Sequence, residues 1–338
     1  MLFSPISIDS LQIKNRIVMA PMCMYAAEKD GKVKPFHIAH YSARALGGVG
    51  LITVEATGVL EEGKISDNCL GIYDDSHIDG LSQLVNNVKS NGSKISIQLA
   101  HAGRKSKASV RSTYSVTSEP YSDTYETPEA MGEQDITRVI KAFGEAAARA
   151  EQAGFDMVQI HAAHGYLLNG FLSAITNTRT DSYGGNDRAK ILVQVVQAVK
   201  ENFGGPVALR INGSDRAEGG LTPHETSTII KLVKPHGVSM IDITSGGLVP
   251  LKNKVFIGNN ISYGEIIKQE TGLPTVSGGG LNSASHMQEI LENNRADMVY
   301  IGRELLSNPF FPLQAAQRLN EPPDWPYTEK VMEGFGKG

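Results

Sequence analysis

The 338-residue sequence predicts one (β/α)8 barrel, a closed ring of eight parallel strands surrounded by helices. Eight short, nearly continuous apolar runs recur along the chain, as strands buried on both faces require. Segments with helical periodicity lie between them, and this alternation indicates parallel strands joined by right-handed crossovers. Eight such units over somewhat more than ~250 residues have the size of a closed barrel. An open doubly wound sheet is the alternative, but its usual sign, a GxGxxG turn after the first strand, does not occur.

The elements follow one another in a regular order. The predicted strands are RIVMAP (16–21), VGLITVEA (49–56), KISIQLAH (94–101), FDMVQIHAAH (155–164), PVALRI (206–211), SMIDITSGG (239–247), PTVSGGG (274–280) and DMVYIGRE (297–304). Helical segments include 135–154, 189–205 and 283–296, several of which end in Gly or Asn, as helix C-termini prefer. The longest irregular stretches, near 102–132 and 165–187, follow the third and fourth strands. Loops of that length in a compact domain are usually functional lids.

Composition narrows the classes of protein and partner. The net charge is -4 and the pI is about 6.2, with basic and acidic residues interspersed, so we expect no nucleic-acid or anionic-membrane partner. No apolar stretch reaches the ~18 to 20 residues that span a bilayer, and the N-terminus lacks a leader pattern, so we expect a cytoplasmic protein. The two cysteines, Cys23 and Cys69, lie outside any CxxC pair, which argues against structural zinc and cysteine-bound iron–sulfur clusters. No linker or repeat divides the chain, so we expect one domain over 1–338 that acts on a small molecule.

Glycines and an arginine follow the last two predicted strands. The active site of a barrel forms where its strands end and the following loops begin. Gly278, Gly279, Gly280 and Gly302 lie at two such points, where backbone N–H groups can approach an anion before a helix begins. Arg303 adds a guanidinium that can hold a phosphate through two hydrogen bonds. The pattern favours a phosphate site, although the glycines could also serve tight turns only.

The fourth strand ends in a pair of histidines. His161 and His164 could converge on one carbonyl oxygen and stabilise the negative charge that develops when hydride adds to a conjugated system. Tyr166, two residues further on, could then supply a proton. A metal site is an alternative reading, but a third ligand at matching spacing is not evident. The histidines could also bond loop backbone, Tyr166 could be a packing residue, and Cys23 could be a small buried apolar residue.

Several motifs together resemble the Old Yellow Enzyme family. They are APMCMY at the first strand, QLAHAGRK at the third, HAAHGYLLNGFLS at the fourth, RTDSYGG after it and IGRELL at the eighth. The resemblance runs from LFSPISI at the N-terminus to about Pro312. The pairing of Cys23 with Tyr25 resembles the bacterial thermophilic-like ene-reductase branch, whose members are NADPH dehydrogenases.

This resemblance implies an FMN-dependent enzyme in which NADPH (or NADH) reduces the flavin and an α,β-unsaturated carbonyl compound then accepts hydride. One face of the flavin would meet Ala20, Pro21, Met22 and Cys23. Its polar edge would meet Ala56, Gln98 and Arg210, and its phosphate would meet Gly279, Gly302 and Arg303. The substrate oxygen would lie between His161 and His164, with Tyr166 as the catalytic proton donor and Tyr25 closing the pocket opposite the histidines. Cys23 would tune the flavin potential through a hydrogen bond.

The chain departs from the family pattern in two places. The usual Ser-x-Glu-Asn-Arg after YGG is replaced by Asn186-Asp187-Arg188, two residues shorter, so the fifth helix could start differently. Near the C-terminus Lys330 lies close to the place where relatives carry an arginine that reaches a neighbouring subunit, and barrels of this kind often form homo-oligomers.

Two other functions stay open at the level of sequence. One is a non-flavin, phosphate-binding lyase or isomerase, for which Glu55 is the only visible carboxylate base. The other is a flavin-binding protein without turnover. Quinones and nitro compounds are further candidate acceptors of hydride from the same flavin.

Overall fold

Eight parallel strands close into a barrel, as the sequence predicts. We describe a computed structural model, which covers residues 1–110, 112–251, 255–322, 326 and 331. Each barrel strand begins within two residues of the start of a predicted run. The strands are β3 (Ile17–Met19), β4 (Leu51–Gly58), β5 (Lys94–Ala100), β8 (Met157–Ala162), β9 (Val207–Ser214), β10 (Val238–Ser245), β11 (Thr275–Gly278) and β12 (Met298–Ile301). Neighbours in sequence pair with one another, and β12 pairs with β3 to close the ring.

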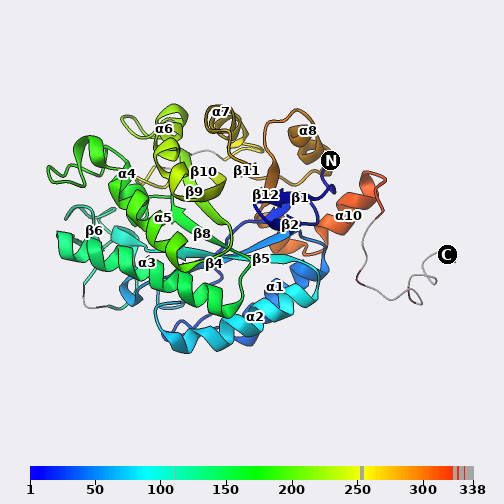
Figure 1. Ribbon diagram of the computed structural model, residues 1–338, viewed down its shortest axis with the longest axis horizontal. Coiled ribbons are helices and arrows are strands. Elements are labelled where there is room, and N and C mark those ends of the chain that lie inside the picture. The colour runs from blue at the N-terminus through cyan, green and yellow to red at the C-terminus, as the bar shows by residue number, and fades with distance from the viewer. Residues whose placement is uncertain (111, 252–254, 323–325, 327–330, 332–338) are drawn as a thin grey trace.

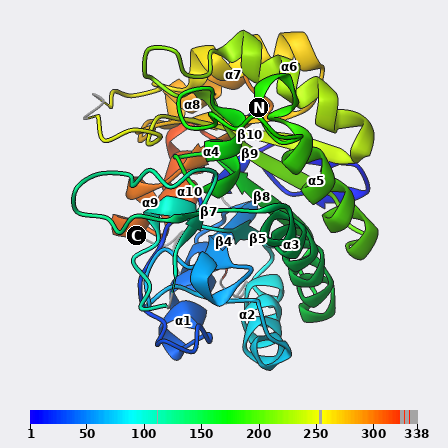
Figure 2. The ribbon, with the colours of Figure 1, turned by 90° about the vertical axis from the view of Figure 1, so that its left-hand side faces the viewer.

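Helices surround the strands in chain order (Figure 2). The longer helices are α1 (Pro35–Leu46), α2 (Ile78–Ser90), α3 (Glu133–Ala153), α5 (Lys190–Asn202), α6 (Pro223–Val233), α7 (Ile261–Thr271) and α8 (Ala284–Glu292). Figure 1 shows α3 and α5 side by side against the barrel. The helices predicted at 135–154, 189–205 and 283–296 correspond to α3, α5 and α8. The chain continues past the barrel into α9 (Arg303–Ser307) and α10 (Phe311–Arg318).

The barrel is closed at the N-terminal ends of its strands by a hairpin. Strands β1 (Ile6–Ile8) and β2 (Leu11–Ile13) pair antiparallel. Their apolar side chains pack with residues from the starts of the barrel strands, including Leu51, Met157 and Met298. Burial of this apolar set stabilises the closed end. The opposite end, where strands lead into loops, is therefore the end open to a ligand.

The two long loops contain short ordered elements. The 102–132 stretch holds the turn η3 (Gly103–Lys105) and the strands β6 (Tyr114–Ser115) and β7 (Glu129–Ala130). The 165–187 stretch holds α4 (Leu167–Leu172) and the turn η4 (Gly185–Asp187). This turn stands where the family pattern is shortened, and α5 begins three residues after it. The shortened segment is thus absorbed before the helix starts.

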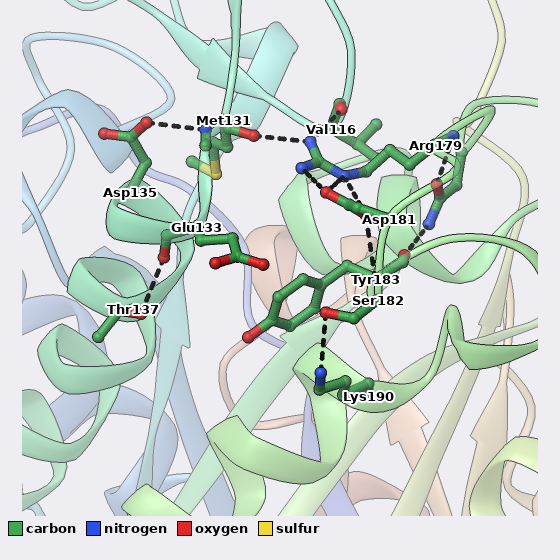
Figure 3. A network of polar contacts seen from close by, with 12 residues as sticks. Val116, Met131, Glu133, Asp135, Thr137, Arg179, Asp181, Ser182, Tyr183 and Lys190 are labelled. Carbon is green, nitrogen blue, oxygen red and sulfur yellow. Dashed lines mark hydrogen bonds and ion pairs between the residues drawn. The ribbon is translucent and has the colours of Figure 1, made fainter.

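One arginine joins these two loops (Figure 3). Arg179 Nη1 donates to the carbonyl oxygens of Val116 at 3.0 Å and Met131 at 2.7 Å. The same guanidinium pairs with Asp181. Hydrogen bonds from a charged donor to loop carbonyls hold the first loop against the second.

Within the described residues, no helix is long and apolar enough to cross a membrane. Lys330, singled out from the sequence, lies outside the described residues.

Candidate active site

Two adjoining cavities lie where the barrel strands end. The larger has a volume of about 990 Å³ and the smaller about 200 Å³, and Pro21, His164 and Arg210 line both. The predicted residues that line the larger cavity are Ala20, Pro21, Met22, His164, Arg210, Gly279, Gly302 and Arg303. Those that line the smaller one are Pro21, Cys23, Tyr25, Ala56, Gln98, His161, His164, Tyr166 and Arg210. The residues assigned to flavin and substrate thus line two adjoining cavities, whereas Gly278, also named for the phosphate site, lines neither.

A chain of buried polar groups forms the junction between the cavities. Gln98 Nε2 donates to Gln159 Oε1 at 2.6 Å, and Gln159 Nε2 donates to Asp242 Oδ2 at 3.0 Å. Arg210 Nη1 reaches the same carboxylate oxygen at 3.3 Å, and its guanidinium lies 5.3 Å from the centre of the Tyr300 ring. Burial raises the pKa of Asp242, while Arg210 opposes that shift. Arg210 Nε is buried without a partner, so this wall keeps a donor for a ligand.

The two histidines lie together at the end of β8. Their ring centroids are 5.5 Å apart, and the Tyr166 ring lies 5.0 Å from that of His161. His164 Nε2 bonds Thr244 Oγ1 at 2.8 Å, whereas His161 Nδ1 is buried without a partner. His164 has a φ of +60°, an uncommon conformation for a residue other than glycine, and such strain clusters at functional sites.

Burial keeps all three of these groups uncharged. It lowers the pKa of His161 well below its ordinary value and that of His164 to about 3, with further contributions from Arg210 and Lys105. Burial also raises the pKa of the Tyr166 hydroxyl far above its usual range. At neutral pH the site therefore presents two neutral imidazoles and a protonated phenol, which suits hydrogen bonding to an oxygen that becomes negative.

The glycine-rich end of the larger cavity is closely packed around the backbone. Gly279 has a φ of +106°, and a Cβ there would meet Asn259 Oδ1 at 2.3 Å. That amide oxygen is buried without a partner. Asn259 Nδ2 donates to Asn260 Oδ1 at 2.9 Å, and Asn260 Nδ2 donates to the Tyr300 hydroxyl at 2.6 Å. Only glycine allows the backbone to pass this close to Asn259. Arg303 Nη2 lies 3.6 Å from the position that a Cβ on the neighbouring Gly280 would take.

The turn after β3 is held by a buried carboxyl group. Glu55 Oε2 accepts a hydrogen bond from the backbone N–H of Met24 at 2.8 Å, and the next residue, Tyr25, has a φ of +52°. Glu55 is fully buried, which raises its pKa to about 7. This contact sets the direction of the turn that carries Cys23 and Tyr25 along the smaller cavity. Burial raises the pKa of Tyr25 to about 12, so its hydroxyl is protonated at neutral pH.

Sequence reasoning missed part of the wall. The loop between β10 and α7 and the side chain of Thr244 contribute to the larger cavity, and Lys105 lies behind the histidines. The additional lining residues that the structure supplies include Arg216, Thr244, Leu251, Val255, Asn259, Asn260 and Glu304. The glycines at 246 and 247 mark a strand end, but they do not reveal that Asn259 and Asn260, more than ten residues later, return to the same cavity.

Comparison with known proteins identifies the family. A model of the NADH:flavin oxidoreductase / NADH oxidase family matches residues 1–322. The chain belongs to this family. This flavin oxidoreductase is 47% identical over 321 residues to an NADPH dehydrogenase of Geobacillus thermodenitrificans, covering 94% of each chain. An NADPH dehydrogenase of Bacillus subtilis is 45% identical over 322 residues, covering 94% of this chain and 95% of its own.

Structural similarity agrees with the sequence comparison. The solved Old Yellow Enzyme homologue from Zymomonas mobilis matches this flavin oxidoreductase with a TM-score of 0.82 at 26% identity, covering 97% of each chain. The resemblance to the Old Yellow Enzyme family is therefore confirmed. The protein is an enzyme that uses FMN as cofactor and a nicotinamide nucleotide as reductant. These findings set aside the non-flavin lyase or isomerase and the flavin binder without turnover.

The residues present fit FMN. The larger cavity lies at the upper end of the ~300 to 1,000 Å³ range of cofactor and ligand pockets. The unpartnered Arg210 Nε can bond the polar edge of the flavin ring. The glycine-rich backbone next to Arg303 can hold the phosphate. Across the described part of the chain, no group of three or more His, Cys, Asp or Glu side chains could hold a metal ion.

Proposed function

We propose that this flavin oxidoreductase reduces the activated C=C bond of α,β-unsaturated carbonyl compounds. When bound, FMN supplies hydride that it has accepted from a nicotinamide nucleotide. We assign the flavin faces and edge to Ala20, Pro21, Met22, Cys23, Ala56, Gln98 and Arg210, and the phosphate to Gly279, Gly302 and Arg303.

The observation that carries this proposal is the neutral imidazole pair. His161 and His164 lie in the smaller cavity with low pKa values, and an unpartnered nitrogen of His161 is buried there. A carbonyl oxygen between the two rings would accept their N–H bonds, which strengthen as the oxygen becomes an enolate. Neutral imidazoles can stabilise that charge in a buried site. A charged imidazolium would first have to be desolvated there, and a neutral ring does not carry that cost.

We assign to Tyr166 the proton transfer that completes the reaction. Its ring contacts that of His161, and its hydroxyl stays protonated because burial raises the pKa. A protonated phenol beside the substrate can donate to Cα as the enolate collapses. Tyr25, which lines the same cavity from the turn after β3, would close the pocket on the opposite side.

The two half-reactions test the proposal separately. We expect His161→Ala with His164→Ala to lower the rate of flavin reoxidation by cyclohexenone by roughly 10² to 10³, since oxyanion donors contribute about that much. Tyr166→Phe should slow the same step with little effect on enone binding. Anaerobic stopped-flow absorbance of the flavin measures both steps. Undiminished reoxidation by cyclohexenone in the double histidine variant would refute the assignment.

The same experiment separates other acceptors. A wild-type flavin that is bleached by NADPH, and is reoxidised by a quinone or a nitro compound but not by cyclohexenone, would show the oxidoreductase activity while contradicting the alkene substrate.

A further inference from the structure

Three buried polar side chains form a network next to the turn that carries His164. Asn212 is on β9, Asp215 directly follows that strand, and Asn169 is on α4. Each of the three is at most 1% exposed, and none lines either cavity of the active site. Burying two amides and a carboxyl group is costly unless each group finds hydrogen-bond partners. The partners of this network therefore show what it holds in place.

The contacts of Asn212 fix the direction in which its amide faces. Its Nδ2 donates to Asp215 Oδ1 at 2.9 Å and to the carbonyl oxygen of Gly246 at 3.0 Å. A third bond from Nδ2 reaches Asn169 Oδ1 at 3.1 Å. Asp215 is anchored in turn, because its Oδ2 accepts a bond from the backbone N–H of Leu221 at 2.9 Å. Since oxygens surround the amide nitrogen, the amide oxygen of Asn212 has to face the other way, toward a donor.

The oxygens of the two asparagines hold consecutive backbone groups of the histidine turn. Asn212 Oδ1 accepts from the N–H of His164 at 3.2 Å, and Asn169 Oδ1 accepts from the N–H of Gly165 at 2.7 Å. The φ angles are +60° at His164 and +72° at Gly165, so both residues are left-handed. This conformation costs free energy for histidine and persists only where the surrounding structure imposes it. The two amide oxygens supply part of that restraint.

Other elements hold the remaining parts of His164. Its carbonyl oxygen accepts from Lys105 Nζ at 2.7 Å, and its ring Nε2 bonds Thr244 Oγ1 at 2.8 Å. The backbone also passes so close to Gly247 that a Cβ there would lie 2.9 Å from the His164 carbonyl oxygen. The buried network thus provides the contact to the N–H, the side of the residue by which the chain enters the turn from β8.

We propose that Asn212 and Asn169 are positioning residues for alkene reduction, which hold His164 in the left-handed conformation that directs its imidazole to the substrate oxygen. The inference rests on the proposed function, in which His164 donates to that oxygen. The two asparagines act through the backbone of the turn, and Asp215 fixes both amides by accepting a bond from each. Because a displacement of about 1 Å in an active site can cost roughly 10² in rate, a restraint on this backbone matters for turnover.

A double-mutant cycle on the FMN-loaded full-length enzyme tests the proposal. We expect Asn212→Ala to slow the reoxidation of reduced flavin by cyclohexenone roughly 10- to 100-fold, because the imidazole loses its alignment. In a His164→Ala background the same substitution should hardly change this rate, since the residue that it positions is gone. Its effect on the free energy of unfolding should persist in both backgrounds. Anaerobic stopped-flow absorbance and denaturant unfolding measure the two quantities.

Asn15→Ala is the matched control. The Asn15 side chain is also buried, accepts from the backbone N–H of Ile17 at 3.1 Å and donates to the carbonyl oxygen of Gly48 at 2.8 Å. It lies just before β3, at the closed end of the barrel. We expect this variant to lose stability and to keep the wild-type rate of reoxidation.

Asn169→Ala is a second variant that releases the same turn. It leaves the N–H of Gly165 without its acceptor, so we expect it to slow reoxidation by cyclohexenone as well. This variant decides the matter where Asn212→Ala does not fold.

A crystal structure of the variant holoenzymes gives a readout that does not depend on alkene turnover. We expect His164 to leave its φ of +60° and its ring to move away from Thr244. The proposal is overturned if His164 keeps its conformation in the variants, or if Asn212→Ala slows reoxidation equally with and without the His164 side chain. By contrast, wild-type reoxidation that is insensitive to His164→Ala contradicts the proposed function, and the crystal structures then decide separately whether the asparagines hold His164.

Discussion

The ammonium group of Lys105 donates hydrogen bonds to the carbonyl oxygens of His164 at 2.7 Å and Gly247 at 3.0 Å. One side chain from the turn after β5 thereby ties together the loops that follow β8 and β10. Lys105 Nζ also lies 5.0 Å from the centre of the Tyr166 ring. Burial lowers the pKa of Lys105 to about 8, and the cation in turn contributes to the low pKa of both active-site histidines.

Replacing Lys105 should therefore disturb the histidines without removing the flavin. We expect Lys105→Met to weaken cyclohexenone binding by about tenfold or more, because losing bonds from a charged donor costs about 1.5 to 3 kcal/mol. The KM for the enone and the Kd for FMN measure the two effects. Lys107→Met is the matched control, because Lys107 is exposed and contacts Tyr125 instead. Equal losses of enone and FMN binding would contradict a positioning role.

The backbone at Gly279 should control cofactor binding. An added Cβ would meet Asn259 Oδ1 at 2.3 Å in a left-handed conformation, so we expect Gly279→Ala to weaken FMN binding at least about tenfold. Gly185→Ala is the control, because its φ is +55° but nothing lies within 4 Å of the added carbon. Fluorescence titration of the apoproteins with FMN compares them. Similar FMN affinities in the two variants would mean that the close contact at Gly279 is unimportant.

Glu55 should make stability depend on pH. Its folded pKa of about 7 lies above the ordinary 4.5, so the folded state holds the proton more tightly than the unfolded state. This contribution to stability is fully present below pH 4.5 and is lost as the pH rises through 7. Glu55→Gln keeps an oxygen for the Met24 N–H and carries no charge. We expect it to gain on the order of 2 kcal/mol relative to the wild type at pH 8 and little at pH 5.

Denaturant unfolding at the two pH values measures this difference. The exposed Glu61→Gln serves as the control, in which no gain on going from pH 5 to pH 8 is expected. A Glu55→Gln variant that is equally stabilised or destabilised at both pH values would show that the buried carboxyl does not titrate in this range.

The link between the long loops should depend on Arg179. Its bonds to Val116 and Met131 hold the first loop against the segment that follows α4. We expect Arg179→Ala to lower the free energy of unfolding by about 2 to 3 kcal/mol and to expose the 102–132 loop to proteolysis. Arg149→Ala removes comparable bonds, to Asp75 and Ile72, without touching that loop. Identical cleavage patterns in the two variants would refute the linking role.

The sequence by itself determined the barrel and most of the site. Eight apolar runs and the helical segments between them are local patterns, and parallel strands with short crossovers leave few other ways to bury them. The residues at the strand ends could be predicted because each lies in the C-terminal part of its strand or directly after it, and the closed ring brings all strand ends to one rim. His161, His164 and Gly279 were predicted on that basis and line the same pair of cavities.

Tertiary structure alone decided the contacts between loops that are distant in sequence. No local pattern indicates that Lys105 bonds His164, that Asn259 packs on Gly279, or that Asn68 bonds Ala27. These pairs are set by where the loops return after leaving the barrel, which depends on packing over the whole rim. The protonation states of the histidines also depended on the tertiary structure. Burial is the largest cause of their low pKa values, and the extent of burial is known only once the chain is folded.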